Sequence, residues 1–220
     1  ITHTLNFRLH PEQAVYIINH AEDKIIFVEL PFVPILEALQ ENLKTVEKYV
    51  VLCEVDEMPE TTLKTAISYE EYIQDGDENY SGPTLEDDAA CALCYTSGTT
   101  GNPKGVLYSH KSNVIHAQAA LTAMTLKPDD TILMVVPLFH VLAWGIPYFG
   151  PMNGLKLVMP GMQMEGEPLF ELIDQEDVTL AFGVPTIWMG LLAYCRDNNK
   201  ILSSVKNTIT IKGQSNFKNT

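Results

Sequence analysis

The chain has 220 residues, of which 46% are hydrophobic and 19% charged, a composition typical of a globular protein rather than a disordered one. Lysine and arginine number 14 against 28 aspartate and glutamate residues, so the formal net charge is −14. This balance argues against nucleic acid as the main partner, because phosphate backbones are bound by basic patches. Residues 1–90 hold 19 of the 28 acidic residues and only 5 of the 14 basic ones. We therefore expect an anionic ligand to bind in the remainder of the chain.

The chain begins with ITHTLNFRLH, which has neither an initiator methionine nor a basic segment followed by an apolar core. We expect a piece of a longer cytoplasmic protein without a secretory signal. Two uncharged stretches, 131–155 and 178–195, are long enough to span a bilayer of about 30 Å. The first contains Pro137, Pro147 and Pro151, which break a membrane helix repeatedly. Both stretches are therefore predicted to be buried elements and not transmembrane segments.

Short β-rich runs alternate with helical patterns in the first half of the chain. We expect strands at 24–29, 48–53 and 90–95, and a helix at 32–43. The polar, acidic stretch 58–85 is predicted to be a surface connection with one short helix near 68–74.

The same alternation continues in the second half. Ser109 is expected to cap a helix that reaches Met124, since Val114, Ala117 and Leu121 keep helical spacing. Further elements are expected as strands at 131–136, 155–159 and 179–183, and as helices at 167–176 and 185–194. This order predicts an α/β fold with largely parallel sheets flanked by helices.

The stretch most informative about chemistry is YTSGTTGNPKGV, residues 95–106, which follows an apolar strand. Glycines let a backbone direct its N–H groups at phosphate oxygens, hydroxyls add donors, and Lys104 adds a positive charge. Pro103 and Gly105 stand where a P-loop requires glycine and a hydroxyl residue, and the glycine spacing excludes the dinucleotide fingerprint. The pattern therefore predicts a phosphate-binding loop of another kind.

Other chemically active side chains carry weaker signals. Cys91 and Cys94 form a C-x-x-C pair, but residues three apart on a strand point to opposite faces and no second pair exists. We therefore expect no metal site. His140 and Trp144 lie in apolar surroundings, where such residues more often belong to a packed core than to a site.

At this point the sequence resembles a known family. YTSGTTGNPKGV is similar to the signature loop of the adenylate-forming, or AMP-binding, superfamily of acyl-CoA synthetases, luciferases and peptide-synthetase adenylation domains. PLFHVLAWG at 137–145 resembles the next core motif as found in fatty-acyl-CoA ligases. NFRLHPEQ at 6–13 and INHAED at 18–23 resemble the medium- and long-chain ligase branch, including methylmercaptopropionate-CoA ligases, and GVPT at 183–186 also fits.

The resemblance implies an acid–thiol ligase, a fatty-acyl-CoA synthetase that uses ATP, Mg²⁺ and coenzyme A. A carboxylic acid would be converted to an acyl-adenylate and then to acyl-CoA. His140 would lie beside the acyl carboxylate, with Trp144, Val184 and Pro185 at the acyl site. Lys104 and His140 are the implied catalytic residues. The implied phosphate ligands are Thr96, Ser97, Gly98, Thr99, Thr100, Gly101 and Lys104.

The family's later motifs, which supply a magnesium-binding glutamate, a ribose-binding aspartate and a late lysine, are not found in this sequence. We therefore expect residues 1–220 to be an incomplete part of the large N-terminal domain, without the C-terminal domain, and inactive when isolated. The whole protein is expected to bind small molecules and could form a homodimer. Two interpretations compete with this one: a luciferase-like or amino-acid-adenylating enzyme, and a non-catalytic or decayed nucleotide-binding fragment.

Overall fold

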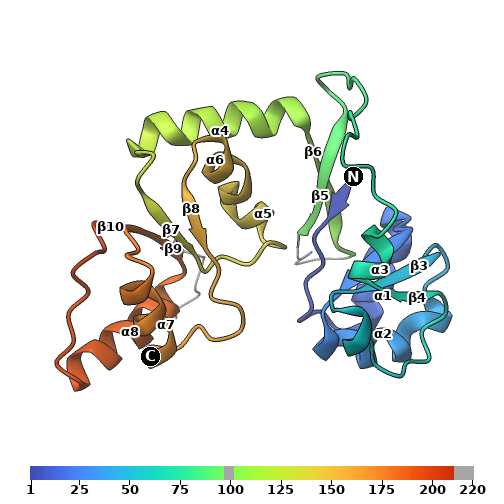
Figure 1. Ribbon diagram of the computed structural model, residues 1–220, viewed down its shortest axis with the longest axis horizontal. Coiled ribbons are helices and arrows are strands. Elements are labelled where there is room, and N and C mark those ends of the chain that lie inside the picture. The colour runs from blue at the N-terminus through green and yellow to red at the C-terminus, as the bar shows by residue number, and fades with distance from the viewer. Residues whose placement is uncertain (97–101, 211–220) are drawn as a thin grey trace. The chain divides into compact units, whose positions relative to one another are not determined.

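The computed structural model describes residues 1–96 and 102–210 (Figure 1). The chain divides into two compact units, one made of Ile1–Glu86 and Cys91–Leu107 and the other of Asp87–Ala90 and Tyr108–Thr220. Parallel strand pairs alternate with helices in both units, which confirms the predicted α/β class with largely parallel sheets.

A parallel sheet in the order β2-β3-β4 forms the centre of the first unit. Its strands are β2 (Ile25–Val28), β3 (Lys48–Val51) and β4 (Ala66–Ser68). The strand β2 alternates, since Ile26 and Val28 are buried while the two residues between and before them are exposed. Its buried face joins a core with the apolar residues of α1 (Pro11–Ala21) and α2 (Val33–Leu39), namely Ile17, Ile18, Val33, Leu36 and Leu39.

The helices of this unit differ in part from the prediction. The expected helix at 32–43 is wrong in extent: the segment folds as η1 (Leu30–Phe32), α2 and η2 (Gln40–Asn42). Pro34 lies in the first turn of α2, where its missing N–H costs nothing, but that residue cannot continue an earlier helix. The helix α1 was not predicted. The short helix near 68–74 is confirmed as α3 (Tyr69–Ile73), capped by the Ser68 hydroxyl.

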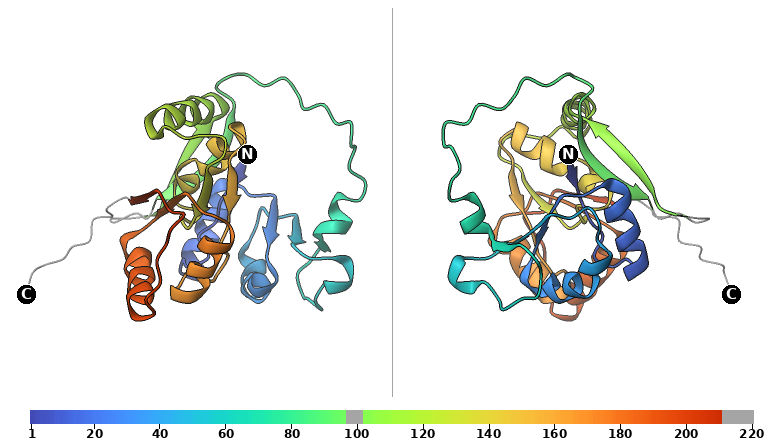
Figure 2. Two further views of the ribbon diagram at one scale, coloured as in Figure 1. Left: turned by 60° about the vertical axis from the view of Figure 1, so that its left-hand side comes forward. Right: turned by 90° about the vertical axis from the view of Figure 1, so that its right-hand side faces the viewer.

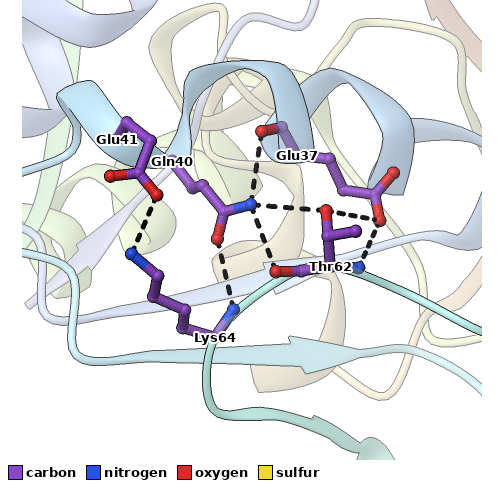
Figure 3. A network of polar contacts seen from close by, with 5 residues as sticks. All are labelled: Glu37, Gln40, Glu41, Thr62 and Lys64. Carbon is purple, nitrogen blue, oxygen red and sulfur yellow. Dashed lines mark hydrogen bonds and ion pairs between the residues drawn. The ribbon is translucent and has the colours of Figure 1, made fainter.

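A network of polar contacts holds α2 and η2 to the segment that leads into β4 (Figure 3). The Glu37 carboxylate accepts hydrogen bonds from the hydroxyl of Thr61 and the backbone N–H of Thr62, at 2.8 and 2.6 Å. The Gln40 amide donates to the Thr62 carbonyl and accepts from the Lys64 N–H, so it pairs with this segment as a strand backbone would. These contacts fix the entry to β4.

A second sheet of the first unit has the order β1-β5-β6 and carries the glycine-rich loop. Its strands are β1 (Thr2–His3), β5 (Ala90–Thr96) and β6 (Lys104–Ser109), and β1 pairs with β5 in parallel. The connection 74–89 from α3 to β5 has neither helix nor strand and takes an extended course (Figure 2). The predicted connection 58–85 is therefore confirmed from residue 74 onward, but it is wrong at β4, a strand that lies within the predicted range; η3 (Val55–Glu57) precedes that range.

The second unit contains a parallel sheet in the order β10-β9-β7-β8. Its strands are β7 (Thr131–Met134), β8 (Lys156–Val158), β9 (Leu180–Gly183) and β10 (Asn207–Thr210). Alternate residues of β7 enter two cores, Ile132 on one face and Leu133 on the other. Helices α4 (His110–Met124) and α6 (Ile146–Met152) cover one face, and α7 (Gly166–Gln175) and α8 (Pro185–Asp197) cover the other (Figure 1). Burial on both faces explains the unbroken apolar runs of the sequence.

Most of the predicted elements of this unit are confirmed, including the Ser109 cap of α4, whose hydroxyl accepts from the Ser112 N–H. Three elements were not predicted, namely α5 (Val141–Trp144), α6 and β10. The short helix α6 tolerates two of the prolines that exclude a membrane-spanning helix, because Pro147 lies in its first turn and Pro151 near its end. The strand β10 forms in a polar segment for which the sequence analysis made no assignment. No helix among the described residues is long and apolar enough to cross a bilayer.

Candidate functional site

The glycine-rich loop starts and ends on neighbouring strands. Thr96 ends β5 and Lys104 begins β6, while the predicted ligands Ser97, Gly98, Thr99, Thr100 and Gly101 lie outside the described residues. The Thr96 hydroxyl donates to the Lys104 carbonyl at 3.4 Å, which joins the two ends of the loop. We call these two ends, with Tyr95 before them and Gly105 after them, the loop neck.

Lys104 is exposed and forms no ion pair with a residue in 1–96 or 102–210. The preceding Pro103 is buried, so the chain is fixed immediately before the lysine. An ammonium group without a carboxylate partner keeps its charge available for an anion. Thr96, which is also exposed, adds a hydroxyl on the other side of the loop neck.

The other predicted site residues follow two neighbouring parallel strands of the second unit. His140 and Trp144 lie beyond the carboxyl end of β7, and Val184 and Pro185 follow β9 directly. In open α/β sheets, ligands bind outside the carboxyl ends of the strands. Thr96 and Lys104 belong to the first unit, so the prediction divides into one group of residues in each unit.

Trp144, from the segment after β7, contacts β9, which leads to Val184 and Pro185. Its ring meets the buried ring of Phe182 edge-on, with centroids 6.4 Å apart. Phe182 lies two residues before Val184, which is 39% exposed, and Pro185 after it begins α8. His140 is exposed, and its backbone N–H closes a turn onto the Pro137 carbonyl at 3.0 Å. The edge of the sheet therefore presents one imidazole beside an aromatic and aliphatic surface.

The backbone between His140 and α6 is left-handed, a feature that the sequence did not predict. The four residues of α5 (Val141–Trp144) have φ between 48° and 57°, and Gly145 has φ 80°. Each non-glycine residue in this conformation costs roughly 1–2 kcal/mol. Leu142 and Ala143 are buried in the turn, and their packing offsets that cost. A strained backbone of this kind is typical of functional sites.

Gly145 ends the left-handed turn against α4. A Cβ on this residue would lie 2.6 Å from two ring atoms of His116, so the close approach requires glycine. The helix α4 thus supports the turn that carries Trp144. No sequence pattern had assigned a role to His116.

Acidic and sulfur-containing side chains do not assemble a metal site in the part of the chain that the structure describes, where no group of three or more His, Cys, Asp or Glu residues could hold an ion. Cys91 is half-buried and Cys94 buried, and neither forms a disulfide. The described residues alone therefore offer no protein ligand set for Mg²⁺.

Known proteins give the same assignment as the loop motif. The family model of the AMP-binding enzymes matches residues 1–216. The chain belongs to the AMP-binding enzyme family. It is 46% identical over 211 residues to 3-methylmercaptopropionyl-CoA ligase of Ruegeria pomeroyi, a match that covers 95% of this chain and 39% of that protein.

Further members of the family extend this result. A medium-chain-fatty-acid–CoA ligase of Ectopseudomonas oleovorans is 47% identical over 195 residues, covering 88% of this chain and 36% of that protein. A solved anthranilate CoA ligase in complex with anthranoyl-AMP has a TM-score of 0.80 at 23% identity, covering 96% of this chain and 40% of that one. The predicted resemblance to the medium- and long-chain ligase branch is confirmed. The chain spans about two fifths of the length of these relatives.

Proposed function

We propose that this chain is part of an enzyme that activates a fatty or other aliphatic carboxylic acid with ATP and transfers the acyl group to coenzyme A. The observation that carries the proposal is the motif at 95–106, in a chain 46% identical to a CoA ligase over 211 residues. The proposal assigns the two groups of site residues to two ligands, the triphosphate of ATP and the acid.

The loop would bind the β- and γ-phosphates and the departing pyrophosphate. Thr96, Ser97, Gly98, Thr99, Thr100 and Gly101 would supply hydroxyl and backbone N–H donors, and Lys104 the positive charge. Fixed donors and charge at the leaving group stabilise the transition state more than flexible water does. This role is supported by the exposed ammonium of Lys104, which has no carboxylate partner among the described residues, beside a fixed loop neck.

The proposed chemistry has two steps. A carboxylate oxygen attacks the α-phosphorus, a new P–O bond forms, the bond to the β-phosphate oxygen breaks, and pyrophosphate leaves. The thiol sulfur of coenzyme A then attacks the carbonyl carbon of the mixed anhydride, and AMP leaves with the bonding electrons. The first step requires the carboxylate oxygen to be held in line with the phosphorus–oxygen bond that breaks, and the second requires the sulfur to be held over the face of the carbonyl carbon. Mg²⁺ would accompany ATP, and no step is assigned to a metal held by the described residues.

The acid is assigned to the carboxyl edge of β7 and β9. His140 would contact the acyl carboxylate, and Trp144, Val184 and Pro185 the acyl chain. The stretches 131–155 and 178–195 contain no charged residue, which favours an apolar acyl group over a polar or charged one.

Two alternatives from the sequence remain distinct from this proposal. A luciferase-like or amino-acid-adenylating enzyme would share the first step but not the transfer to coenzyme A. The Ruegeria and Ectopseudomonas relatives are named as CoA ligases, which favours the transfer. A non-catalytic fragment is disfavoured by the complete loop motif with Lys104.

The proposal also includes the setting of the enzyme. Residues 1–220 would form part of the large N-terminal domain of a cytoplasmic protein whose partners are small molecules, and the whole protein could form a homodimer. Support for the first statement is the match to about 39% of the relatives' length. Light scattering of the full-length protein measures the oligomeric state directly.

The test is an acid screen on the full-length protein, with straight-chain, branched, aromatic and amino acids at equal concentration. ATP–pyrophosphate exchange reports the first step, and loss of the free thiol reports the second. We expect exchange and acyl-CoA formation with aliphatic acids above all others. Exchange without thioester formation, or a preference for amino acids, would contradict the proposal.

A further inference from the structure

The loop neck is held by a group of side chains that the loop motif does not explain. Tyr95, the last residue before Thr96, is the centre of this group. Its ring lies over Gly105, where a Cβ would be 3.2 Å from Cζ of Tyr95 and 3.1 Å from a methyl group of Leu93. Because Tyr95 precedes the loop and Gly105 follows it, this contact joins the two ends of the loop. The hydrogen bond from the Thr96 hydroxyl to the Lys104 carbonyl joins them a second time.

The hydroxyl of Tyr95 is held by helix α1. It lies 2.7 Å from Nδ1 of His20, a residue 75 positions earlier in the chain. Tyr16, one turn before His20, stacks on the imidazole with ring centroids 5.3 Å apart. Burial, together with Tyr16 and Asp23 nearby, raises the pKa of Tyr95, so the phenol keeps its proton at neutral pH and can donate it to His20.

A second histidine lies against the Tyr95 ring. The ring centroid of His3 is 5.2 Å away, and its Nδ1 lies 2.8 and 3.0 Å from the two carboxylate oxygens of Asp23. The side chains of His3 and Asp23 are 5% and 14% exposed, so this buried pair holds its position against the Tyr95 ring. The strand β1 that carries His3 pairs with β5 in the same region, His3 opposite Leu93.

We propose that Tyr95 and His20 are positioning residues for the phosphate-binding loop, and that the contact from His20 through Tyr95 to Gly105 fixes the loop neck so that Thr96 and Lys104 are in position before ATP binds. This inference rests on the proposed function. A loop whose ends are fixed in advance loses less conformational freedom when its ligand binds, so the contact acts on affinity for ATP and pyrophosphate. The acid, assigned to the other unit, is not affected.

The test uses Tyr95→Phe in the full-length protein, because this change removes the hydroxyl and leaves the ring on Gly105. A net hydrogen bond of the ordinary strength predicts that the dissociation constant for ATP, measured by calorimetry, rises about fivefold. The KM for the acid stays within error of the wild type. Tyr194→Phe is the matched control, because it removes a phenol that donates to Glu167 in the other unit. It should leave ATP affinity unchanged.

His20 supplies the second arm. His20→Leu should weaken ATP binding as much as Tyr95→Phe does. The double variant should bind ATP no more weakly than either single variant, because both changes remove the same hydrogen bond. His20→Asn keeps a polar atom near the position of Nδ1 and should restore most of the affinity. Unchanged ATP affinity in Tyr95→Phe and His20→Leu, or fully additive losses, would overturn the inference. Absence of pyrophosphate exchange in a wild type that binds ATP would overturn the proposed function instead.

Discussion

The two units hold their candidate site residues by different means. In the second unit, the turn that carries Trp144 rests on a sheet buried on both faces, where Ala143, Ile146 and Phe149 are fully buried. In the first unit, the loop neck joins the end of β5 to the start of β6, whose residues Lys104–Leu107 are exposed, and a few polar contacts of Tyr95 and Thr96 hold it.

The difference distinguishes contacts that stabilise the fold from contacts that mainly position one side chain. Apolar packing spreads its free energy over many contacts, so a buried residue is costly to remove and holds a strained backbone in place. A polar contact at the surface contributes little net free energy, but it fixes the direction of one group. We expect substitutions in the two regions to differ in the same way, and the following variants, from the largest effect to the smallest, test this difference.

Phe149→Ala should cause the largest loss of stability. The side chain is fully buried in α6 between the sheet and α4, and its ring packs on Phe182 with centroids 6.0 Å apart. Removal of a buried phenylalanine lowers the free energy of unfolding by about 3–5 kcal/mol, measured by urea unfolding. The control is Met189→Ala in α8, at a residue that is 69% exposed, and it should cost about 0.5 kcal/mol or less. Equal effects of both variants would contradict the comparison.

Gly145→Ala should lower the free energy of unfolding by about 2–3 kcal/mol. The new Cβ would meet the His116 ring at 2.6 Å, and alanine at a φ of 80° is strained. A second change, His116→Ala, removes the collision but not the backbone strain. Urea unfolding should therefore show partial recovery in the double variant. No recovery would mean that the contact with α4 does not support the turn.

Asp130→Asn tests a polar contact just before β7, in the sheet of the second unit. Burial raises the pKa of Asp130, but the opposing hydrogen bonds from the Lys127 N–H and the Thr179 hydroxyl, with the Lys206 charge, leave that pKa below its usual value. A lowered folded-state pKa gives stability that is present above the unfolded pKa of about 3.9 and is lost as the pH falls through the folded pKa.

We therefore expect Asp130→Asn to cost about 1–2 kcal/mol at pH 7 and to approach the wild type as the pH falls from about 4 to below the lowered folded-state pKa. Unfolding measured at both pH values checks this result. Asp129→Asn, at the exposed neighbouring carboxylate, is the control and should show no such difference. A loss for Asp130→Asn that is the same at both pH values would show that its charge contributes nothing.

Glu37→Gln should have the smallest effect. Two hydrogen bonds lower the pKa of the Glu37 carboxyl, one from the Thr62 N–H (Figure 3) and one from the Thr61 hydroxyl. As for Asp130, the pKa is lower in the folded state than in the unfolded state. The carboxylate therefore stabilises the fold above the unfolded pKa of about 4.3 and ceases to do so as the pH falls through the folded-state pKa. A small decrease in Tm at pH 7 that disappears in acid is expected. A decrease larger than that of Asp130→Asn would contradict this ranking of the two carboxylates.

The sequence predicted much of the fold where one signal was sufficient. The strand runs, the Ser109 cap and the first-turn proline of α8 indicated the right elements, because period, capping and proline position are local. The same locality explains the errors. The prolines in 131–155 excluded a membrane-spanning helix but did not indicate the short helix α6, and β10 is a strand because β9 pairs with it and not because of its own composition.

The candidate site shows the same limit. The motif identified Lys104 and the loop, and the PLFHVLAWG string identified His140 and Trp144, because these residues are close in sequence. The contact of His20 with Tyr95 joins residues 75 positions apart, and no local pattern predicts it. The left-handed turn before Gly145 was also missed, because four consecutive residues other than glycine rarely adopt it.

The central claim is that the loop ending in Lys104 binds the pyrophosphate end of ATP during acyl-adenylate formation. ATP–pyrophosphate exchange with an aliphatic acid, measured on full-length wild type and Lys104→Ala, tests it most directly. The control is Lys111→Ala, which removes an exposed lysine that pairs with Asp87 at 3.6 Å. We predict about a hundredfold loss of exchange in Lys104→Ala, as for other fixed transition-state donors, and none in Lys111→Ala. Equal exchange rates in Lys104→Ala and the wild type would contradict the account.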